Sequence, residues 1–246
     1  MKRTHNNWID ADWAAPAHVH AGTTTRSGGA SPAPFNGFNL AGHVGDEAEA
    51  VAENRLQLRK QLNLPAEPLW LQQQHGNRVI KAETEQPGPA DGAYTGTGGV
   101  VCAVQTADCI PLLLCNRDGT EIAALHIGWR GLCKRIIQRG LSMFNAAPHE
   151  LSAWIGPHIS QENYEVGADV VSACSSIWAE TRLAIPPGRA GHWYLDLGQL
   201  VKTDLLQLAV TDISDCKQCT CANKEMFYSY RRDGVTGRMA SLIWME

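Results

Sequence analysis

Three side chains in separate segments have the chemistry of a metal site. His75, Cys109 and His126 supply two imidazoles and one thiol, each at the end of a predicted strand. Catalytic zinc is typically held by three protein ligands of these types, with a fourth position left for water or substrate. The set therefore predicts a catalytic zinc site. Buried histidines and cysteines that only satisfy hydrogen bonds are the alternative, because no short motif forces these residues together.

The same residues also permit a cysteine nucleophile. In that arrangement Cys109 attacks, His126 acts as the base and Asp108 orients the imidazole. Neighbouring residues on a strand point to opposite faces, so Asp108 and Cys109 share a site only where the strand has ended. We therefore favour the metal interpretation over the nucleophile.

Arginines in two turn-like segments are candidates for binding an anion. Arg130 stands within the glycine-flanked Gly128–Gly131, and Arg231–Arg232 follows an aromatic run. A guanidinium binds phosphate or carboxylate through two parallel hydrogen bonds. Surface arginines are common at turns, so each alone indicates little, but two beside one cleft would make an anion site.

A long polar loop is predicted over Ala21–Gly45. It is rich in Gly, Ser, Thr, Pro and Asn, and loops of this length are usually either functional or disordered. Interspersed apolar residues favour an ordered loop, in which Arg26, Asn39 and His43 are the candidate ligand groups. The alternative is a solvated loop whose polar groups satisfy its own backbone.

The eight cysteines are expected to be reduced thiols. Several stand inside apolar runs, which suits buried thiols in a cytoplasmic protein better than a disulfide framework. Near the chain end, Cys216, Cys219 and Cys221 resemble a zinc knuckle superficially, but no fourth ligand stands at short spacing. We interpret these three as free thiols near the mouth of a site.

The candidate residues depend on a central group of predicted strands. Val100–Gln105 and Ile110–Cys115 are short and apolar, which is typical of strands buried on both faces. Asn116–Gly119 has turn composition, so the second strand should fold back as a hairpin onto Glu121–His126. The apolar spacing of Leu132–Phe144 predicts a helix.

Further elements are predicted on both sides of this group. Asp46 is the expected cap of a helix that ends near Asn63, and Gln86–Gly99 is expected to be a loop. The other predicted strands are Ala17–His20, Leu69–Gln74, Val79–Ala82, Leu151–Ile155, Tyr194–Leu197 and Ala240–Trp244, and the other helices are Ala168–Glu180 and Gly198–Ala209.

Length and charge narrow the class of protein. A chain of 246 residues can bury one sizeable core, so we expect a single domain over residues 1–246. The net charge of −4 argues against binding to nucleic acid, because phosphate backbones require a basic surface. A small-molecule partner is therefore expected. The sequence leaves the oligomeric state open, and a monomer is favoured.

The first residues, MKRTHNNWIDADWAAP, lack the apolar run of a secretory signal. No stretch approaches the roughly 20 apolar residues that a membrane helix needs. We therefore expect a cytoplasmic protein with no membrane partner.

A series of motifs covers nearly the whole chain and resembles the YfiH family, also called polyphenol oxidase or laccase-domain proteins and related to the human FAMIN domain. The motifs are, in order, QQxHGxxV, ADGxxT, TADCxPLLL, HxGWRGL, IGPxI, YEVG and CT followed by FYSYRR. The resemblance implies an α/β fold, a single domain with a mixed β-sheet and flanking helices, and zinc bound by His75, Cys109 and His126.

The resemblance also implies purine-nucleoside chemistry. The expected activities are phosphorolysis of adenosine, inosine and S-methyl-5′-thioadenosine, and deamination of adenosine. In that chemistry Asn39 and His43 are candidates for binding the sugar, and Asp108 for moving a proton. The candidates for phosphate are Arg26, Arg55, Arg130 and Arg231.

Other functions are attached to the same family. Some bacterial members are linked to peptidoglycan editing, in which an amidase removes L-serine from a UDP-MurNAc precursor. Copper-dependent phenol oxidation is the least favoured, because a multicopper centre needs paired HxH segments and the chain has one such pair, His18–His20. Cu²⁺ bound at the zinc ligands is the remaining route to it. A non-enzymatic domain stabilised by its metal is a further alternative.

Overall fold

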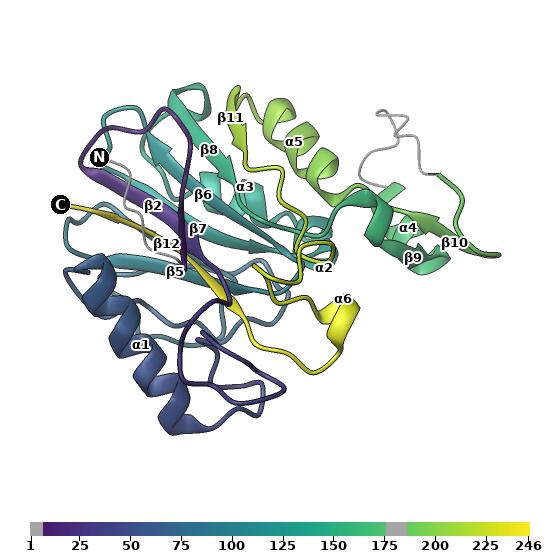
Figure 1. Ribbon diagram of the computed structural model, residues 1–246. Coiled ribbons are helices and arrows are strands. Elements are labelled where there is room, and N and C mark those ends of the chain that lie inside the picture. Colours follow the sequence, from purple (N-terminus) through teal and green to yellow (C-terminus); the bar gives the residue numbers. More distant parts are fainter. Residues whose placement is uncertain (1–6, 176–185) are drawn as a thin grey trace.

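Two β-sheets form the centre of the molecule, and helices cover their outer faces (Figure 1). The structure is a computed structural model and describes residues 7–175 and 186–246. The larger sheet has six strands in the order β11-β8-β6-β7-β4-β3. Their bounds, in that order, are Asp212–Asp215, Leu151–Ile155, Ile110–Asn116, Ile122–Ile127, Gly92–Thr95 and Val79–Lys81.

The smaller sheet has four antiparallel strands in the order β1-β2-β12-β5. These strands are Trp8–Asp10, Val19–Thr24, Met239–Met245 and Val101–Thr106. A separate two-stranded antiparallel sheet pairs β9, Glu165–Gly167, with β10, His192–Tyr194. The six-stranded sheet is mixed, since β11 and β3 each run parallel to a neighbour while its other pairs are antiparallel.

Six α-helices are found in the described residues. They are α1 Ala48–Leu62, α2 Trp129–Cys133, α3 Ile136–Leu141, α4 Ala168–Ser175, α5 Leu197–Gln207 and α6 Tyr230–Asp233. Single 3₁₀ turns cover Pro148–Glu150 and Gln161–Asn163. No helix in the described ranges is long and apolar enough to cross a membrane.

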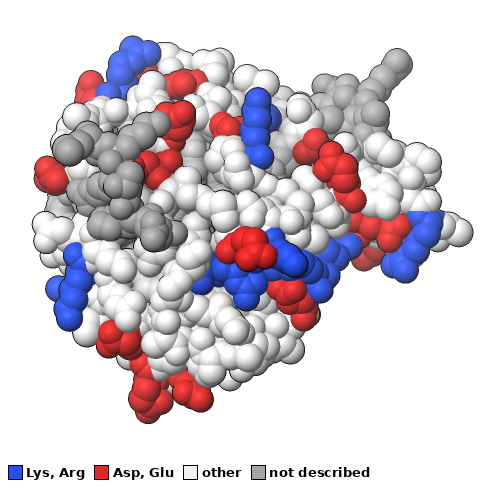
Figure 2. Space-filling model, viewed as in Figure 1, with Lys and Arg blue, Asp and Glu red and all other residues white. Residues whose placement is uncertain are grey.

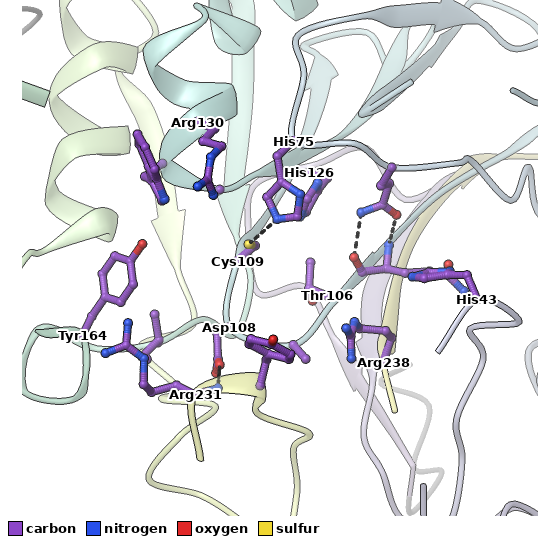
Figure 3. Close-up of a pocket in the computed structure, with 17 residues that line it drawn as sticks. His43, His75, Thr106, Asp108, Cys109, His126, Arg130, Tyr164, Arg231 and Arg238 are labelled. Carbon is purple, nitrogen blue, oxygen red and sulfur yellow. Dashed lines mark hydrogen bonds between the residues drawn. The ribbon is translucent and has the colours of Figure 1, made fainter. Parts of the chain in front are cut away.

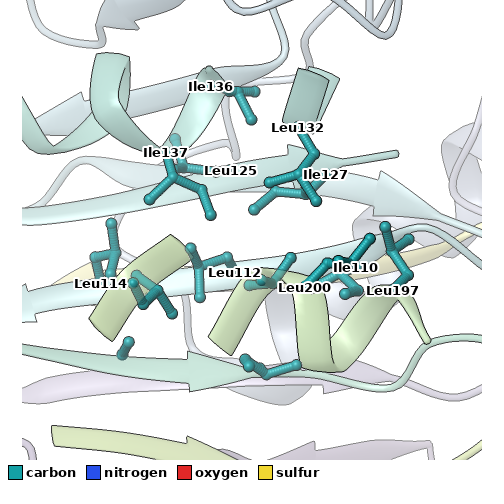
Figure 4. Packing of buried hydrophobic residues seen from close by; sticks show 14 of the residues in the cluster. Ile110, Leu112, Leu114, Leu125, Ile127, Leu132, Ile136, Ile137, Leu197 and Leu200 are labelled. Atoms are coloured by element: carbon teal, nitrogen blue, oxygen red, sulfur yellow. The ribbon is translucent and has the colours of Figure 1, made fainter. Parts of the chain in front are cut away.

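Strand β6 explains why the layers stack as they do. Its residues are all buried, and they alternate between the two faces of the sheet. Leu113 and Cys115 pack between the two sheets, whereas Ile110, Leu112 and Leu114 pack toward the helices (Figure 4). Burying each leucine or isoleucine contributes about 1.5–3 kcal/mol. The prediction of a strand buried on both faces is confirmed.

The helices fill the two outer layers. Figure 4 shows Leu132 of α2 and Ile137 of α3 over β7, and Leu200 of α5 beside β6. On the far side of the smaller sheet, α1 packs Leu58 and Leu62 against strands β5 and β12. The resulting order of layers is α1, four-stranded sheet, six-stranded sheet, and α2, α3 and α5. The predicted mixed α/β fold is confirmed.

The hairpin prediction is also confirmed. Strands β6 and β7 pair antiparallel, with Ile110 opposite Ile127 and Cys115 opposite Ile122. The turn between them is held by Asn116, whose side-chain oxygen accepts the backbone N–H groups of Thr120 and Glu121. The hairpin therefore fixes the ends of β6 and β7 side by side.

The predicted helix over Leu132–Phe144 is wrong as a single element. Arg135 has a φ of 65°, which no α-helix allows, so α2 ends before it and α3 begins after it. The apolar spacing remained informative because both short helices still face the sheet. The loop predicted over Gln86–Gly99 contains β4, where a Cβ on Gly92 would lie 2.5 Å from the Leu125 side chain.

Other predicted boundaries differ from the structure. Leu69–Gln74 forms isolated bridges rather than a strand. β2 begins at Val19 and continues into the expected loop, and β10 ends at Tyr194, where a strand was expected to begin. Asp46 does not cap α1, because its carboxylate accepts the Asn39 amide. The predicted helix Ala168–Glu180 is seen to residue 175, and the remainder lies outside the described residues.

Candidate active site

The structure brings His75, Cys109 and His126 to one point at the ends of the central strands (Figure 3). One ligand atom from each lies within 4.8 Å of the others. The Cys109 Sγ atom is 3.7 Å from His75 Nε2, and the two imidazole rings are 4.8 Å apart and nearly perpendicular. His126 is buried, His75 is exposed and Cys109 is intermediate. This is the only group of three such side chains in the described residues.

Local backbone geometry makes this meeting possible. His126 stands near the end of β7, and Cys109 immediately precedes β6. His75 and Asp108 have positive φ angles of 55° and 97°, so both lie in sharp turns. Asp108 therefore lies beyond the end of β5, the condition under which adjacent residues can line one site.

A buried carboxylate links two of the three segments. Asp91 accepts hydrogen bonds from the backbone N–H groups of Gln74, His75 and Gly76 and from His126 Nδ1. Burial by itself would raise the pKa of Asp91, but the bonds from His126 and Gly76 hold the pKa below its ordinary value. Asp91 is therefore ionised, and it holds His126 by its Nδ1 with Nε2 directed away from the carboxylate.

The donor set fits a metal ion. A zinc-bound histidine commonly donates its second ring nitrogen to a carboxylate, as His126 does to Asp91. Burial would raise the pKa of Cys109, yet His126 and His75 lower it to about 6, so the group is a thiolate at neutral pH. Two imidazoles and a thiolate suit Zn²⁺, and they also suit copper.

Gly128 leaves the space that the ligands occupy. A Cβ atom at this position would lie 2.8 Å from His75 Cδ2 and 3.1 Å from Cys109 Sγ. Its φ of −89° is open to any residue, so the requirement for glycine comes from crowding and not from the backbone.

The three ligand residues line a cavity of about 510 Å³, within the usual range for small-molecule sites. Trp129, Tyr164 and Tyr230 provide aromatic surface on its walls. Figure 2 shows Lys and Arg side chains gathered around α6, whose last turn carries Arg231 and Arg232. The cavity is thus both aromatic and cationic.

Three guanidiniums line this cavity without a carboxylate partner. No ion pair joins Arg130, Arg231 or Arg238 to an acidic side chain in residues 7–175 or 186–246. Arg130 lies over the Trp129 ring and Arg231 over the Tyr164 ring. Arg238 is half-buried, whereas Arg130 and Arg231 are exposed. An unpaired, half-buried cation beside two exposed ones favours an anionic ligand.

Among the described residues, Asp108 is the one carboxylate on the cavity wall, and its oxygens are already engaged. Oδ1 accepts the Thr220 hydroxyl hydrogen and Oδ2 accepts the Arg231 backbone N–H, each with a donor–acceptor distance of 2.7 Å. Asp91, and not Asp108, is the partner of His126. The arrangement considered for a cysteine nucleophile, with Asp108 orienting the imidazole, is therefore not formed.

Seven of the eleven candidate residues lie on the cavity wall, namely His43, His75, Asp108, Cys109, His126, Arg130 and Arg231. Four do not. Arg232 pairs with Asp233 and donates to the Thr220 and Cys221 carbonyls. Arg26 lies over the Tyr228 ring, and Arg55 bonds the Leu40 carbonyl. Asn39 is fully buried, and its amide bonds Asp46, Ala41 and the Arg238 backbone, so it supports the wall from behind.

The sequence did not single out several residues that the structure places at the site. Asp91 is part of the ADGxxT motif, but nothing in its spacing indicated a bond to His126. Thr106 and Arg238 line the cavity from the ends of two paired strands, since Met239 lies opposite Thr106. Thr106 and Arg238 lie close together because β5 and β12 are neighbours in the sheet. The hydrophobic periodicity of the sequence does not reveal which strands are neighbours.

The late cysteines form no metal group in the part of the chain that the structure describes. All eight cysteines are free. Cys219 Sγ accepts hydrogen bonds from the Ser160 backbone and hydroxyl, and its pKa is lowered by these bonds although burial opposes them. Cys216, Cys219 and Cys221 are free, as predicted, but none of them lines the cavity at which they were expected.

Relatives named for an enzyme activity match almost the full length of the chain. The purine nucleoside phosphorylase YfiH of Shigella flexneri is 44% identical over 240 residues, covering 96% of this chain and 98% of that protein. A purine nucleoside phosphorylase of Haemophilus influenzae is 42% identical over 241 residues, covering 97% of this chain and 99% of that protein.

Solved structures show the same fold. A Neisseria meningitidis protein superposes with a TM-score of 0.93 at 41% identity, covering 98% of this chain and all of that one. YlmD from Geobacillus stearothermophilus superposes with a TM-score of 0.92 at 28% identity, covering 100% and 98%. The family model described as multi-copper polyphenol oxidoreductase laccase matches residues 20–246. The chain therefore belongs to the YfiH family of laccase-like proteins.

Proposed function

We propose that this protein is a zinc-dependent purine nucleoside phosphorylase that acts on adenosine, inosine and S-methyl-5′-thioadenosine. One observation carries the proposal: a group of metal donors lies in a cavity whose three guanidiniums have no carboxylate partner in the described chain. A neutral nucleoside needs no such excess of positive charge, but a phosphate co-substrate does. The names of the relatives support the same reaction.

The proposed reaction transfers a ribosyl group. A phosphate oxygen bonds C1′ of the ribose while the bond from C1′ to the purine nitrogen breaks. The bonding electron pair leaves with the purine, which takes up a proton, so the products are the free base and ribose 1-phosphate. The site must therefore hold an anion beside the sugar and stabilise negative charge on a departing base.

The chain's own groups meet these requirements. His75, Cys109 and His126 would hold Zn²⁺, which when bound supplies a Lewis acid that stabilises developing negative charge. Asp91 keeps His126 in one tautomer. Arg130 and Arg231 offer N–H donors beside the aromatic wall, where a planar base can stack.

Adenosine deamination is proposed as a second activity of the same cavity. Water replaces the 6-amino group and ammonia leaves, which requires an activated water and a proton carrier. The usual zinc deaminase signature, HxE with PCxxC, is absent from the sequence. The His-Cys-His group would therefore replace it, and Asp108 is the nearest carboxylate on the wall.

We further propose that residues 1–246 act as one catalytic domain in the cytoplasm, as a monomer. Eight free cysteines suit a reducing compartment. The metal donors and the cationic groups of the cavity all come from one chain.

Product analysis tests the proposed function. Protein of known zinc content is incubated with adenosine or inosine, with and without phosphate, and the products are separated by chromatography. Phosphate-dependent release of base with an equal amount of ribose 1-phosphate is expected, and inosine formed from adenosine without phosphate would establish deamination. Chelation of zinc should abolish both, and zinc should restore them.

The peptidoglycan-editing amidase is the alternative to test if nucleosides are returned unchanged. Its UDP-MurNAc-L-serine substrate carries a diphosphate, which the unpaired guanidiniums would also suit. Phenol oxidation is less favoured, because the described residues offer one group of metal donors and a multicopper oxidase needs several copper sites. Among the described residues, phenol oxidation would depend on copper bound at the His-Cys-His group.

A further inference from the structure

The two ends of the cavity differ in chemistry. On one side of the metal ligands, Figure 3 shows Tyr164, Arg130 and Arg231; on the other it shows Arg238 and His43. The first end also contains Trp129, so its cations lie over aromatic rings. The second end is mainly polar, although Arg238 lies over the Tyr230 ring at 6.0 Å. Gln73 and Gln105, which also line the cavity, are bonded to the backbone. The rings of the first end suit a planar base, whose carbonyl and ring-nitrogen acceptors can take N–H groups of Arg130 and Arg231, and a small anion suits the second end.

Arg238 is held in place with donors to spare. Its Nη1 atom donates to the carbonyls of Thr236 and Gly237, at 2.8 and 2.9 Å, and its backbone N–H donates to Asn39. These bonds fix the guanidinium, while its Nε and Nη2 atoms have no hydrogen-bond partner among the described residues. Burial lowers the pKa of Arg238, so the charge is held at a cost. An anion would compensate that cost.

Thr106 provides a second, independent observation. Its side chain is 2% exposed, and its hydroxyl has no hydrogen-bond partner in the described ranges, although buried hydroxyls are normally bonded. Thr106 lies between Cys109 and Arg238 in Figure 3 and lines the cavity. A ligand at this end would satisfy the hydroxyl.

We propose that Arg238, with the Thr106 hydroxyl and the His43 ring beside it, binds inorganic phosphate, and that the purine occupies the opposite end between Trp129 and Tyr164. The assignment of phosphate rests on the proposed function. A guanidinium fork binds two phosphate oxygens at once, and the hydroxyl donates to a third. The phosphate and the base then lie on opposite sides of the metal ligands, with C1′ of the ribose between them. Displacement requires this arrangement, because the phosphate oxygen approaches C1′ from the side opposite the departing base.

Steady-state kinetics with varied phosphate and varied inosine tests this assignment. Arg238→Gln should raise KM for phosphate at least about tenfold, because charge-assisted hydrogen bonds are lost, and leave KM for inosine within about twofold. Thr106→Val, which keeps the shape of the side chain, should raise KM for phosphate in the same direction. Arg59→Gln, on the exposed face of α1, is the matched control and should behave as wild type.

Arg130→Gln tests the opposite end of the cavity, where the base is assigned. It should raise KM for inosine and leave KM for phosphate unchanged. The assignment is overturned if Arg130→Gln raises KM for phosphate while Arg238→Gln does not. If Arg238→Gln folds poorly, Arg238→Lys replaces it in the test. Lysine keeps the charge but not the two parallel N–H donors of the guanidinium, so a smaller rise in KM for phosphate is expected. Melting curves and zinc content are measured for every variant.

Direct titration of inorganic phosphate into the zinc-loaded protein separates the two proposals. If phosphate binds and Arg238→Gln abolishes the binding, the anion site stands even where no nucleoside is cleaved, and only the proposed reaction fails. If wild type cleaves nucleosides with phosphate but Arg238→Gln binds phosphate equally well, the anion site is wrong and the reaction stands.

Discussion

His126 donates its Nδ1 hydrogen to Asp91 Oδ1 over 2.8 Å, and the same carboxylate accepts the backbone N–H of His75 over 2.9 Å. One buried side chain therefore fixes two of the three metal donors, although they come from different segments. Asp91 immediately precedes β4, which pairs with the strand that carries His126. The carboxylate thus couples strand pairing to the geometry of the metal donors.

Asp91→Asn should weaken zinc binding by about 10–100-fold, the usual cost of losing a partner behind a metal ligand. The asparagine amide turns one acceptor into a donor, and that donor must face N–H groups of residues 74–76 or of His126. Competition with a coloured chelator measures the affinity. Asp118→Asn, in the exposed turn after β6, is the control. Unchanged zinc affinity in Asp91→Asn would show that the carboxylate does not position the donors.

Much of the fold could be predicted from single residues and their spacing. The β6–β7 hairpin followed from apolar runs on each side of Asn116–Gly119, because a turn and two buried strands leave few other arrangements. Strand β4 could not be predicted in the same way. Its Gly92 and Ala93 have the composition of a loop, and only close packing against Leu125 explains them. Composition describes a residue, whereas packing depends on its neighbours in space.

The candidate site shows the same division. The types of His75, Cys109 and His126 and their places at predicted strand ends indicated a metal site, but they also allowed buried side chains that only satisfy hydrogen bonds. The family motifs favoured the metal site. Arg238 was missed because arginine is common on surfaces, and its significance lies in the absence of a carboxylate partner within the described residues. Asn39 was expected at the site because it is polar, but it is buried behind the wall and bonded there.

Gly128→Ala should disrupt the metal donors without unfolding the protein. The added methyl would lie 2.8 Å from His75 Cδ2, so the imidazole must move away from Cys109. We expect zinc affinity to fall at least about tenfold, since ligand geometry is a condition of tight binding. Gly88→Ala, where the methyl would meet only an atom 3.9 Å away, is the matched control. Equal zinc affinity in the two variants would contradict the crowding argument.

Cys109→Ala distinguishes an enzyme from a domain that the metal only stabilises. The variant loses a ligand, so phosphorolysis should fall at least about a hundredfold, more than the loss of an outer partner costs. In an enzyme the metal-free forms of wild type and variant should melt within about 3 °C of each other, because a single thiol contributes about 1 kcal/mol. Cys221→Ala, outside the cavity, should keep full activity. A collapsed fold in Cys109→Ala alone would favour the structural role.

Glu121 makes the stability of the β4–β7 region depend on pH. Burial would raise the pKa of Glu121, but bonds from the Asn145 backbone, the Tyr94 hydroxyl and the Ala146 backbone hold it below its ordinary value of 4.5. A carboxyl whose pKa is lowered by folding stabilises the protein above the unfolded pKa, and this stability is lost as the pH falls through the folded pKa.

Glu121→Gln should therefore lower the free energy of unfolding by about 1.5–3 kcal/mol at pH 7, the contribution of hydrogen bonds to a charged group. The difference from wild type should shrink as the pH falls below 4.5, because the wild-type carboxyl then becomes protonated and loses the same advantage. Urea unfolding across this range measures it, with the exposed Glu225→Gln as control. A difference that stays constant down to acid pH would mean that shape, and not charge, makes Glu121 stabilising.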